Sequence, residues 1–146
     1  MRVLVAVKAT EQSESGVMPD DPSMFIEMGK FNDELIAAGV MLDGAGLKAS
    51  ANGKRLTFQG GKATVVDGPF AETKELIAGF WIWQCASLHE AIEWVKRCPN
   101  PMLTDSEIEI RQIFSAEDFG EAFTPELQEH DERLRAKLAQ QQGKGG

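Results

Sequence analysis

Hydrophobic and polar residues alternate in short runs at the start of the chain and then recur at helical spacing. The run 2–8 (Arg-Val-Leu-Val-Ala-Val-Lys) is apolar on both alternating faces, which predicts a strand covered on both sides. Residues 10–20 are polar and contain Ser, Gly and Pro, so we expect a loop there. A capping Asp and a proline then precede apolar residues at helical spacing, which predicts a helix over 22–38 ending at Gly39.

The middle of the chain contains many glycines. The segment 43–46 (Asp-Gly-Ala-Gly) predicts a bend. Residues 54–59 and 62–66 form two β-like runs around Gly60 and Gly61. Two glycines between such runs are typical of a two-residue hairpin turn, because both positions tolerate positive φ.

The pattern then returns to strand and helix signals. We interpret 67–70 as a turn and 71–76 as a segment that can form one helical turn. The run 77–85 is apolar on both faces, which indicates a central strand. A capping box at Ser87 predicts a second helix. The alternation of apolar and polar residues over 107–114 predicts a strand with one solvent-exposed face.

This order of elements predicts an α+β fold, a ferredoxin-like two-layer sandwich with an extra C-terminal helix over 125–141. We expect a domain over 1–114 and an extension over 115–146, with a polar helix and a frayed end. Two helices cover only one face of a sheet, yet the strands at 2–8 and 77–85 are apolar on both faces. We therefore predict a homodimer packed sheet to sheet or along its edges. The alternative is that the tail helix covers the second face by itself, which its polar composition disfavours.

Composition narrows the class of protein. The chain has 146 residues, 42% hydrophobic and 26% charged, as in a globular domain. A net charge of −8 argues against a nucleic-acid surface, and the first apolar run is too short for a signal peptide or a membrane span. Two cysteines, Cys85 and Cys98, are too few for a disulfide framework and favour the cytoplasm. The sequence has no nucleotide or zinc signature, so we expect no cofactor and no metal site.

The run from Asp67 to Glu75 (Asp-Gly-Pro-Phe-Ala-Glu-Thr-Lys-Glu), followed by Gly79-Phe80, resembles the YCII-related family, specifically its DGPF-motif branch. The resemblance covers about residues 1–114. It implies a ferredoxin-like dimer of the dimeric α/β barrel type. Most members of this branch have no assigned activity, and they are often associated with extracytoplasmic-function sigma factors.

Better-studied relatives in this family carry a His–Asp pair proposed as an acid–base site, and a few process aromatic ring compounds. The family's histidine falls near Met28, but this sequence has no histidine before His89. The chain therefore departs from the pattern that supports His–Asp chemistry.

Asp67 is the first candidate catalytic residue and Glu72 the second. A carboxylate at the mouth of a cleft can accept a proton or hold a polar ligand. The favoured interpretation is structural, because Asp before Gly-Pro stabilises a turn and because Glu72 belongs to a charged run typical of a solvated face. The candidate ligand-binding residues are Gly68, Pro69, Phe70 and Trp81.

Trp81 and Trp83 lie two residues apart on one face of their strand. They can line a pocket for a planar ligand or pack in the core, which is the commoner use of such rings.

Two functions stay open. The first is a homodimer that binds a small metabolite, with aromatic compounds among the candidates, near the loop 67–75. If it is an enzyme, the reaction is a proton transfer or elimination without a cofactor. The second is a non-catalytic accessory or regulatory module that acts through protein contacts, in a sigma-factor pathway by family association alone.

Overall fold

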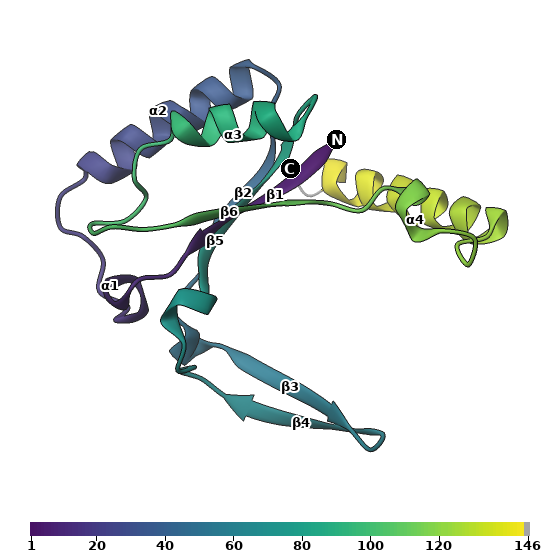
Figure 1. The fold of residues 1–146 in the computed structure, drawn as a ribbon, viewed down its shortest axis with the longest axis horizontal. Helices are drawn as coiled ribbons and strands as arrows, with labels where there is room; N and C mark the ends of the chain where they lie inside the picture. Colours follow the sequence, from purple (N-terminus) through teal and green to yellow (C-terminus); the bar gives the residue numbers. More distant parts are fainter. Residues whose placement is uncertain (145–146) are drawn as a thin grey trace. The chain divides into compact units, whose positions relative to one another are not determined.

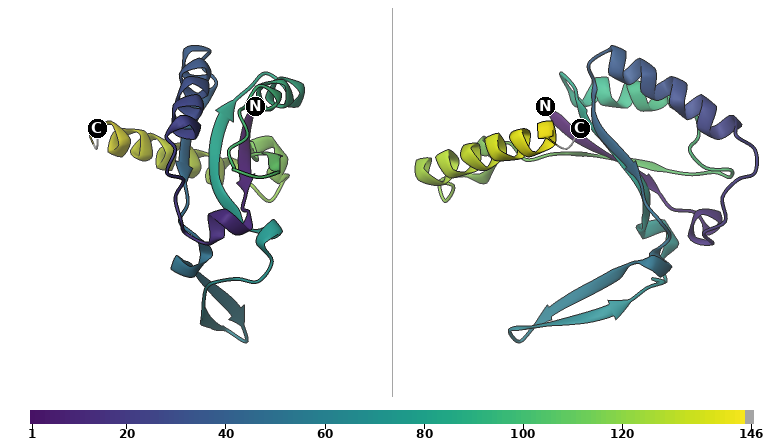
Figure 2. Two further views of the ribbon diagram at one scale, coloured as in Figure 1. Left: turned by 90° about the vertical axis from the view of Figure 1, so that its left-hand side faces the viewer. Right: turned by 180° about the vertical axis from the view of Figure 1, so that it is seen from behind.

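The computed structural model describes residues 1–144 (Figure 1), and the final two residues of the end expected to be frayed lie outside this range. The chain divides into two compact units, Met1–Ile113 and Phe114–Gly146. The first unit contains a four-stranded sheet, two helices on one face of that sheet, and a separate two-stranded hairpin (Figures 1 and 2).

The sheet has the strand order β2-β5-β1-β6, and all neighbouring strands are antiparallel. Its two central strands pair with Val5 opposite Trp81. With the hairpin set aside, the order strand, helix, strand, strand, helix, strand gives the ferredoxin-like topology, so the expected α+β fold is confirmed. The four strands are β1 (Arg2–Lys8), β2 (Met41–Gly46), β5 (Ile77–Gln84) and β6 (Ile108–Gln112).

Helix α2 (Ser23–Ala37) confirms the helix expected over 22–38. The Asp21 side chain accepts a hydrogen bond from the backbone N–H of Ser23 at 2.9 Å, which satisfies one free donor at the helix start. The helix ends before Gly39, whose φ of +73° is the left-handed conformation that favours glycine.

Helix α3 (Leu88–Lys96) begins with half of the expected capping box. The Ser87 hydroxyl accepts the Glu90 N–H at 3.2 Å, whereas the Glu90 carboxylate accepts the N–H of Ala86 rather than that of Ser87. On this helix Ala91 is buried, whereas Leu88 is 45% exposed. The face of α3 that meets the core includes Trp94, whose ring packs against the buried cluster.

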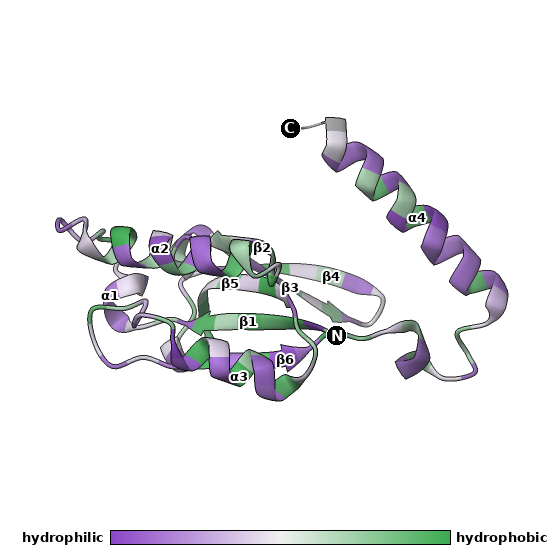
Figure 3. Cartoon of the chain, turned by 90° about the horizontal axis from the view of Figure 1, so that it is seen from above, coloured by the Kyte–Doolittle hydropathy of each residue, from purple (hydrophilic) through white to green (hydrophobic). Residues whose placement is uncertain are grey.

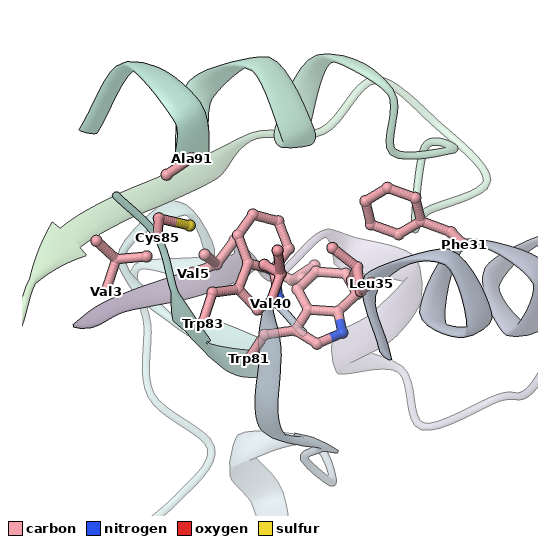
Figure 4. Packing of buried hydrophobic residues seen from close by; sticks show 10 residues of the cluster. Val3, Val5, Phe31, Leu35, Val40, Trp81, Trp83, Cys85 and Ala91 are labelled. Atoms are coloured by element: carbon pink, nitrogen blue, oxygen red, sulfur yellow. The ribbon is translucent and has the colours of Figure 1, made fainter. Parts of the chain in front are cut away.

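The core lies between the two helices and one face of the sheet (Figure 4). Phe31 from α2 meets three indole rings edge-on, those of Trp81, Trp83 and Trp94, at centroid distances of 6.1 to 6.3 Å. Such edge-to-face pairs are favourable beyond the area they bury. The Trp83 indole N–H is buried, and it finds no hydrogen-bond partner among the described residues.

The loop expected over 10–20 contains a short helix, α1 (Glu11–Glu14), so that expectation was wrong in part. Thr10 and Ser13 form a reciprocal capping box, in which each side chain bonds the other residue's backbone. These local hydrogen bonds form one helical turn without any apolar periodicity, which is why the hydrophobic pattern missed it.

The bend expected over 43–46 was also wrong, because these residues belong to the edge strand β2. Gly44 is needed there because a Cβ at this position would lie 2.9 Å from Cδ1 of Trp81. The glycine lets the edge strand lie against the indole ring.

The expected hairpin consists of β3 (Lys54–Gln59) and β4 (Lys62–Asp67), which form their own two-stranded sheet (Figure 1). Both glycines of its turn have positive φ, +59° and +76°. Leu56 pairs with Val65 and Phe58 with Ala63, so one face of the hairpin is apolar. All residues of both strands are exposed, and Phe58 reaches 82%.

The second unit contains a cluster of three phenylalanine rings and helix α4 (Pro125–Lys144). Phe119 lies between Phe114 and Phe123, at centroid distances of 4.9 and 5.1 Å. Helix α4 is mostly hydrophilic (Figure 3). Within residues 1–144, we find no helix whose length and apolar character would let it cross a membrane.

Candidate functional site

A cavity of about 780 Å³ lies beside α2, β2 and the first half of β5. Its lining is mainly apolar and includes the aromatic residues Phe25, Phe80 and Trp81. Five of the six methionines of the chain contribute to it. Thioether side chains are flexible and polarisable, so a wall of this kind adapts to the shape of an apolar ligand. The five methionines are Met18, Met24, Met28, Met41 and Met102.

Trp81 is the fixed part of the cavity wall. Its indole N–H donates to Oδ1 of Asn32 on α2 at 2.9 Å, and its ring meets Phe31 edge-on. The side chain is 6% exposed, so one part of the ring faces the cavity and the rest belongs to the core. The hydrogen bond and the packing together hold the ring in one orientation.

The polar part of the lining is small. The Gln12 side chain donates to the carbonyl of Val17 at 2.7 Å, and the Ser13 hydroxyl donates to the carbonyl of Thr10 at 3.0 Å. These two side chains therefore hold the segment before α2 in place. Lys48 is the one charged residue of the lining.

The loop that contains Asp67 is held mainly by backbone contacts. The N–H of Gly68 donates to the carbonyl of Gly53 at 3.0 Å, and the N–H of Phe70 donates to the Ser50 hydroxyl at 3.0 Å. A Cβ on Gly68 would lie 1.8 Å from the Ser50 carbonyl oxygen, so only glycine fits this backbone path. The Asp67 carboxylate is 71% exposed and forms an ion pair with Lys54 at 2.6 Å.

Two further contacts fix this loop. The Arg55 guanidinium lies 3.8 Å from the centroid of the Phe70 ring, a cation–π contact. The Glu14 carboxylate accepts the backbone N–H of Ser50 at 2.9 Å and also accepts its hydroxyl. Ser50 thus links α1 to the loop, a connection that no local sequence pattern indicates.

The residues predicted from the sequence fall into two places. Trp81 lines the cavity. Asp67 and Glu72 are both exposed and lie outside the cavity lining, so the structure does not bring these carboxylates together with Trp81. Pro69 is exposed, and its peptide bond to Gly68 is cis. Gly68 and Phe70 also lie outside the cavity lining, in the loop that Gly53 and Ser50 hold by hydrogen bonds.

Sequence reasoning missed the methionine wall. Met24 and Met28 follow one another at helical spacing, which equally suits a core stripe. In the structure both are half-buried and line the cavity, while Phe31 and Leu35 of the same stripe are buried in the core. The pattern along the helix does not distinguish these two surroundings.

The remaining titratable candidates are the two thiols. Burial raises the pKa of Cys98 to about 11. Burial, and then the negative charge of Glu90, raise the pKa of Cys85. Both cysteines are free, and high pKa values disfavour the reactive thiolate. Among the described residues, no group of three or more His, Cys, Asp or Glu side chains is placed to hold a metal ion.

Fold and cavity together define a ferredoxin-like α+β protein with a ligand-sized apolar pocket beside its edge strand. The model of the YCII-related domain matches residues 1–117, so the chain belongs to the YCII-related family. Membership of the DGPF branch stays a prediction.

The chain is also similar to two other proteins. An uncharacterized protein of Rhizobium meliloti (strain 1021) is 30% identical over 94 residues, which cover 64% of this chain and 76% of the relative. A solved structure of 5-chloro-2-hydroxyhydroquinone dehydrochlorinase from Burkholderia phenoliruptrix AC1100, in complex with 2,5-dihydroxybenzoquinone, is 15% identical. The match covers 80% of this chain and 98% of that chain, with a TM-score of 0.43.

Proposed function

We propose that this protein binds a small, largely apolar metabolite in the cavity beside α2 and β2. The observation that carries the proposal is the cavity itself, about 780 Å³ in volume and lined by methionine and aromatic side chains. This volume lies within the range of about 300–1,000 Å³ that small-molecule sites occupy. Trp81 supplies a small, fixed part of the wall, and the methionines supply an adaptable part.

Filling the cavity tests this proposal. Gly46 lines the cavity, has no positive φ, and would place a Cβ in open space, so Gly46→Leu puts a side chain into the cavity without straining the backbone. We expect the substitution to weaken binding of the neutral probe 2-naphthamide by about tenfold or more, measured by calorimetric titration. Gly29→Leu, at an exposed helix position that is also open, is the matched control and leaves binding unchanged. Equal binding by both variants would contradict the proposed site.

Asp67 and Glu72 remain the first and second candidates for acid–base chemistry, as a proton transfer or elimination without a cofactor. Exposure of both carboxylates to solvent supports proton exchange. Their place outside the cavity lining favours binding alone as the function of the cavity. A ring compound turned over by the wild type and by Asp67→Asn at equal rates would remove Asp67 from the reaction.

We propose in addition that the protein is a homodimer formed through the uncovered face of the sheet. Leu4 pairs with Ile82 on the side opposite to the buried Trp81, and both residues are only half-buried. An apolar centre of this kind in contact with water favours self-association. We expect Ile82→Glu to give monomers in sedimentation equilibrium, while Ile36→Glu, an exposed position on α2, keeps the dimer.

A second candidate function, an accessory module that contacts another protein, is favoured by one feature of the second unit. Leu127, Leu134 and Leu138 of α4 recur at spacings of seven and four residues, and each is 44–51% exposed. A full-length chain with all three changed to Lys keeps its fold but loses any partner captured by the wild type. A partner retained by this variant would exclude α4 as the contact surface.

We also propose a reducing, cytoplasmic setting, which the two free and poorly ionised thiols support. Full alkylation of both thiols after denaturation of the protein isolated from cells tests this. A disulfide found under those conditions would argue for another compartment.

A further inference from the structure

The charge distribution around the cavity identifies the class of ligand more closely than its apolar lining does. The chain as a whole has a net charge of −8, yet the one charged residue in the cavity lining is a cation, Lys48. Lys48 forms no ion pair within 4.0 Å among residues 1–144, and neither do Lys62, Lys74 and Lys137, but of these four lysines only Lys48 lines the cavity. The cavity therefore carries a single positive charge that the protein leaves available.

A neutral hydrogen-bond donor lies close to Lys48 in the chain. Asn52 also lines the cavity, and it closes the single 3-10 turn Ser50–Asn52. Its side-chain amide makes no hydrogen bond within the described chain, while the other polar lining residues, Gln12 and Ser13, bond the backbone of their own segment. Lys48 and Asn52 are thus the two lining residues whose polar side chains are unpaired within residues 1–144.

The nearby carboxylate does not neutralise this end of the cavity. Glu14 approaches the same segment, but its two oxygens accept the N–H and the hydroxyl of Ser50. Asp67 is paired with Lys54. Neither carboxylate lines the cavity, so a negatively charged ligand group meets no acidic residue of the lining.

We infer that the ligand is an amphipathic anion, with a flat apolar body against Trp81 and the methionines and one carboxylate or similarly charged oxygen group at Lys48 and Asn52. This inference rests on the proposed function of the cavity and specifies its substrate class. Lys48 is exposed, so its contribution is that of a partly solvated ion pair. The apolar wall supplies most of the affinity, and Lys48 sets the preference for an anion.

Two probes of the same ring and nearly the same shape separate these contributions, 2-naphthoate and the neutral 2-naphthamide. We expect the wild type to bind naphthoate about three- to tenfold more tightly than naphthamide in calorimetric titrations, the range of a charge-assisted contact near the surface. Raising the salt concentration should reduce the affinity for naphthoate and leave that for naphthamide unchanged.

The variant Lys48→Gln should bind the two probes equally while keeping the wild-type affinity for naphthamide. Lys62→Gln, at an exposed hairpin position outside the lining, is the matched control and should keep the preference for naphthoate. Equal wild-type affinities for the two probes, or a preference that survives Lys48→Gln, would overturn the anion inference while naphthamide binding sustains the proposed function. If the wild type binds neither probe, both the anion inference and the proposed function are contradicted.

Discussion

The cavity wall and the Asp67–Phe70 loop are built in different ways, although both lie in the first unit. The wall is made by side chains, and its fixed point is the Trp81 ring bonded to Asn32. The loop is made by the backbone, with Gly68 pressed against the carbonyl of Ser50. The conspicuous motif at Asp67–Phe70 therefore follows from the backbone path of its loop. The ligand-sized cavity is instead lined by residues that form no sequence motif.

The largest effect expected from this comparison is at Gly68. Gly68→Ala should lower the free energy of unfolding by about 3 kcal/mol, because the added Cβ would overlap the Ser50 carbonyl oxygen and the backbone must move. Urea unfolding followed by circular dichroism measures the change. Gly29→Ala, in the exposed part of α2, is the control and should stabilise the protein by about 0.5–1 kcal/mol. A loss below about 1 kcal/mol at Gly68 would mean that the loop is not held by its backbone.

The second effect separates the two tryptophans that share a face of β5. Trp81→Phe leaves Oδ1 of Asn32 without its donor, whereas Trp83→Phe removes an N–H that is already unpaired. We therefore expect Trp81→Phe to cost about 1 kcal/mol more than Trp83→Phe in thermal or urea unfolding. The reverse order would show that packing around Trp83 outweighs the hydrogen bond of Trp81.

A smaller effect is expected at the exposed carboxylate of the loop. Asp67→Asn removes an ion pair between side chains that are 71% and 61% exposed, so the loss of stability should be about 0.2–1 kcal/mol. Binding of 2-naphthamide should not change, because Asp67 lies outside the cavity lining. Loss of binding in this variant, with its melting temperature preserved, would instead make Asp67 part of the ligand site.

The last effect concerns pH and is absent at neutral pH, where the Cys98 thiol is protonated in both the folded and the unfolded chain. Burial raises the pKa of Cys98 from 9.0 to about 11, so the folded protein holds this proton more tightly than the unfolded chain. The stability supplied by the neutral thiol is fully present below pH 9.0 and is lost as the pH rises towards about 11. The difference between wild-type and Cys98→Ala unfolding curves over this interval isolates the effect. A difference independent of pH would contradict the burial of this thiol.

Much of the fold could be predicted because its signals are local. The strands at 2–8 and 77–85, the helix over 22–38 and the two-glycine hairpin each follow from spacing, capping or turn chemistry within a few residues. The edge strand β2 could not be predicted, because glycines are typical of a bend and the contact between Gly44 and the Trp81 ring joins residues remote in sequence.

The candidate site was predictable only in part, for a related reason. Trp81 was a candidate for a pocket wall, with core packing the commoner use of such a ring, and in the structure it lines the cavity and also belongs to the core. Lys48 and the five methionines come from separate segments between residues 18 and 102, and no spacing rule connects them.

Hydrophobic periodicity and turn residues act between neighbours in the chain, so the sequence predicts most of the elements, their order and the ferredoxin-like class; the edge strand β2 and the short helix α1 are the exceptions. Only the tertiary structure decided which apolar residues fill the core and which line a cavity. A side chain at helical spacing is buried or left beside an empty space according to what packs opposite it, and that partner is remote in sequence. Met28 and Phe31 illustrate this, since one turn of the same helix separates a cavity wall from the core.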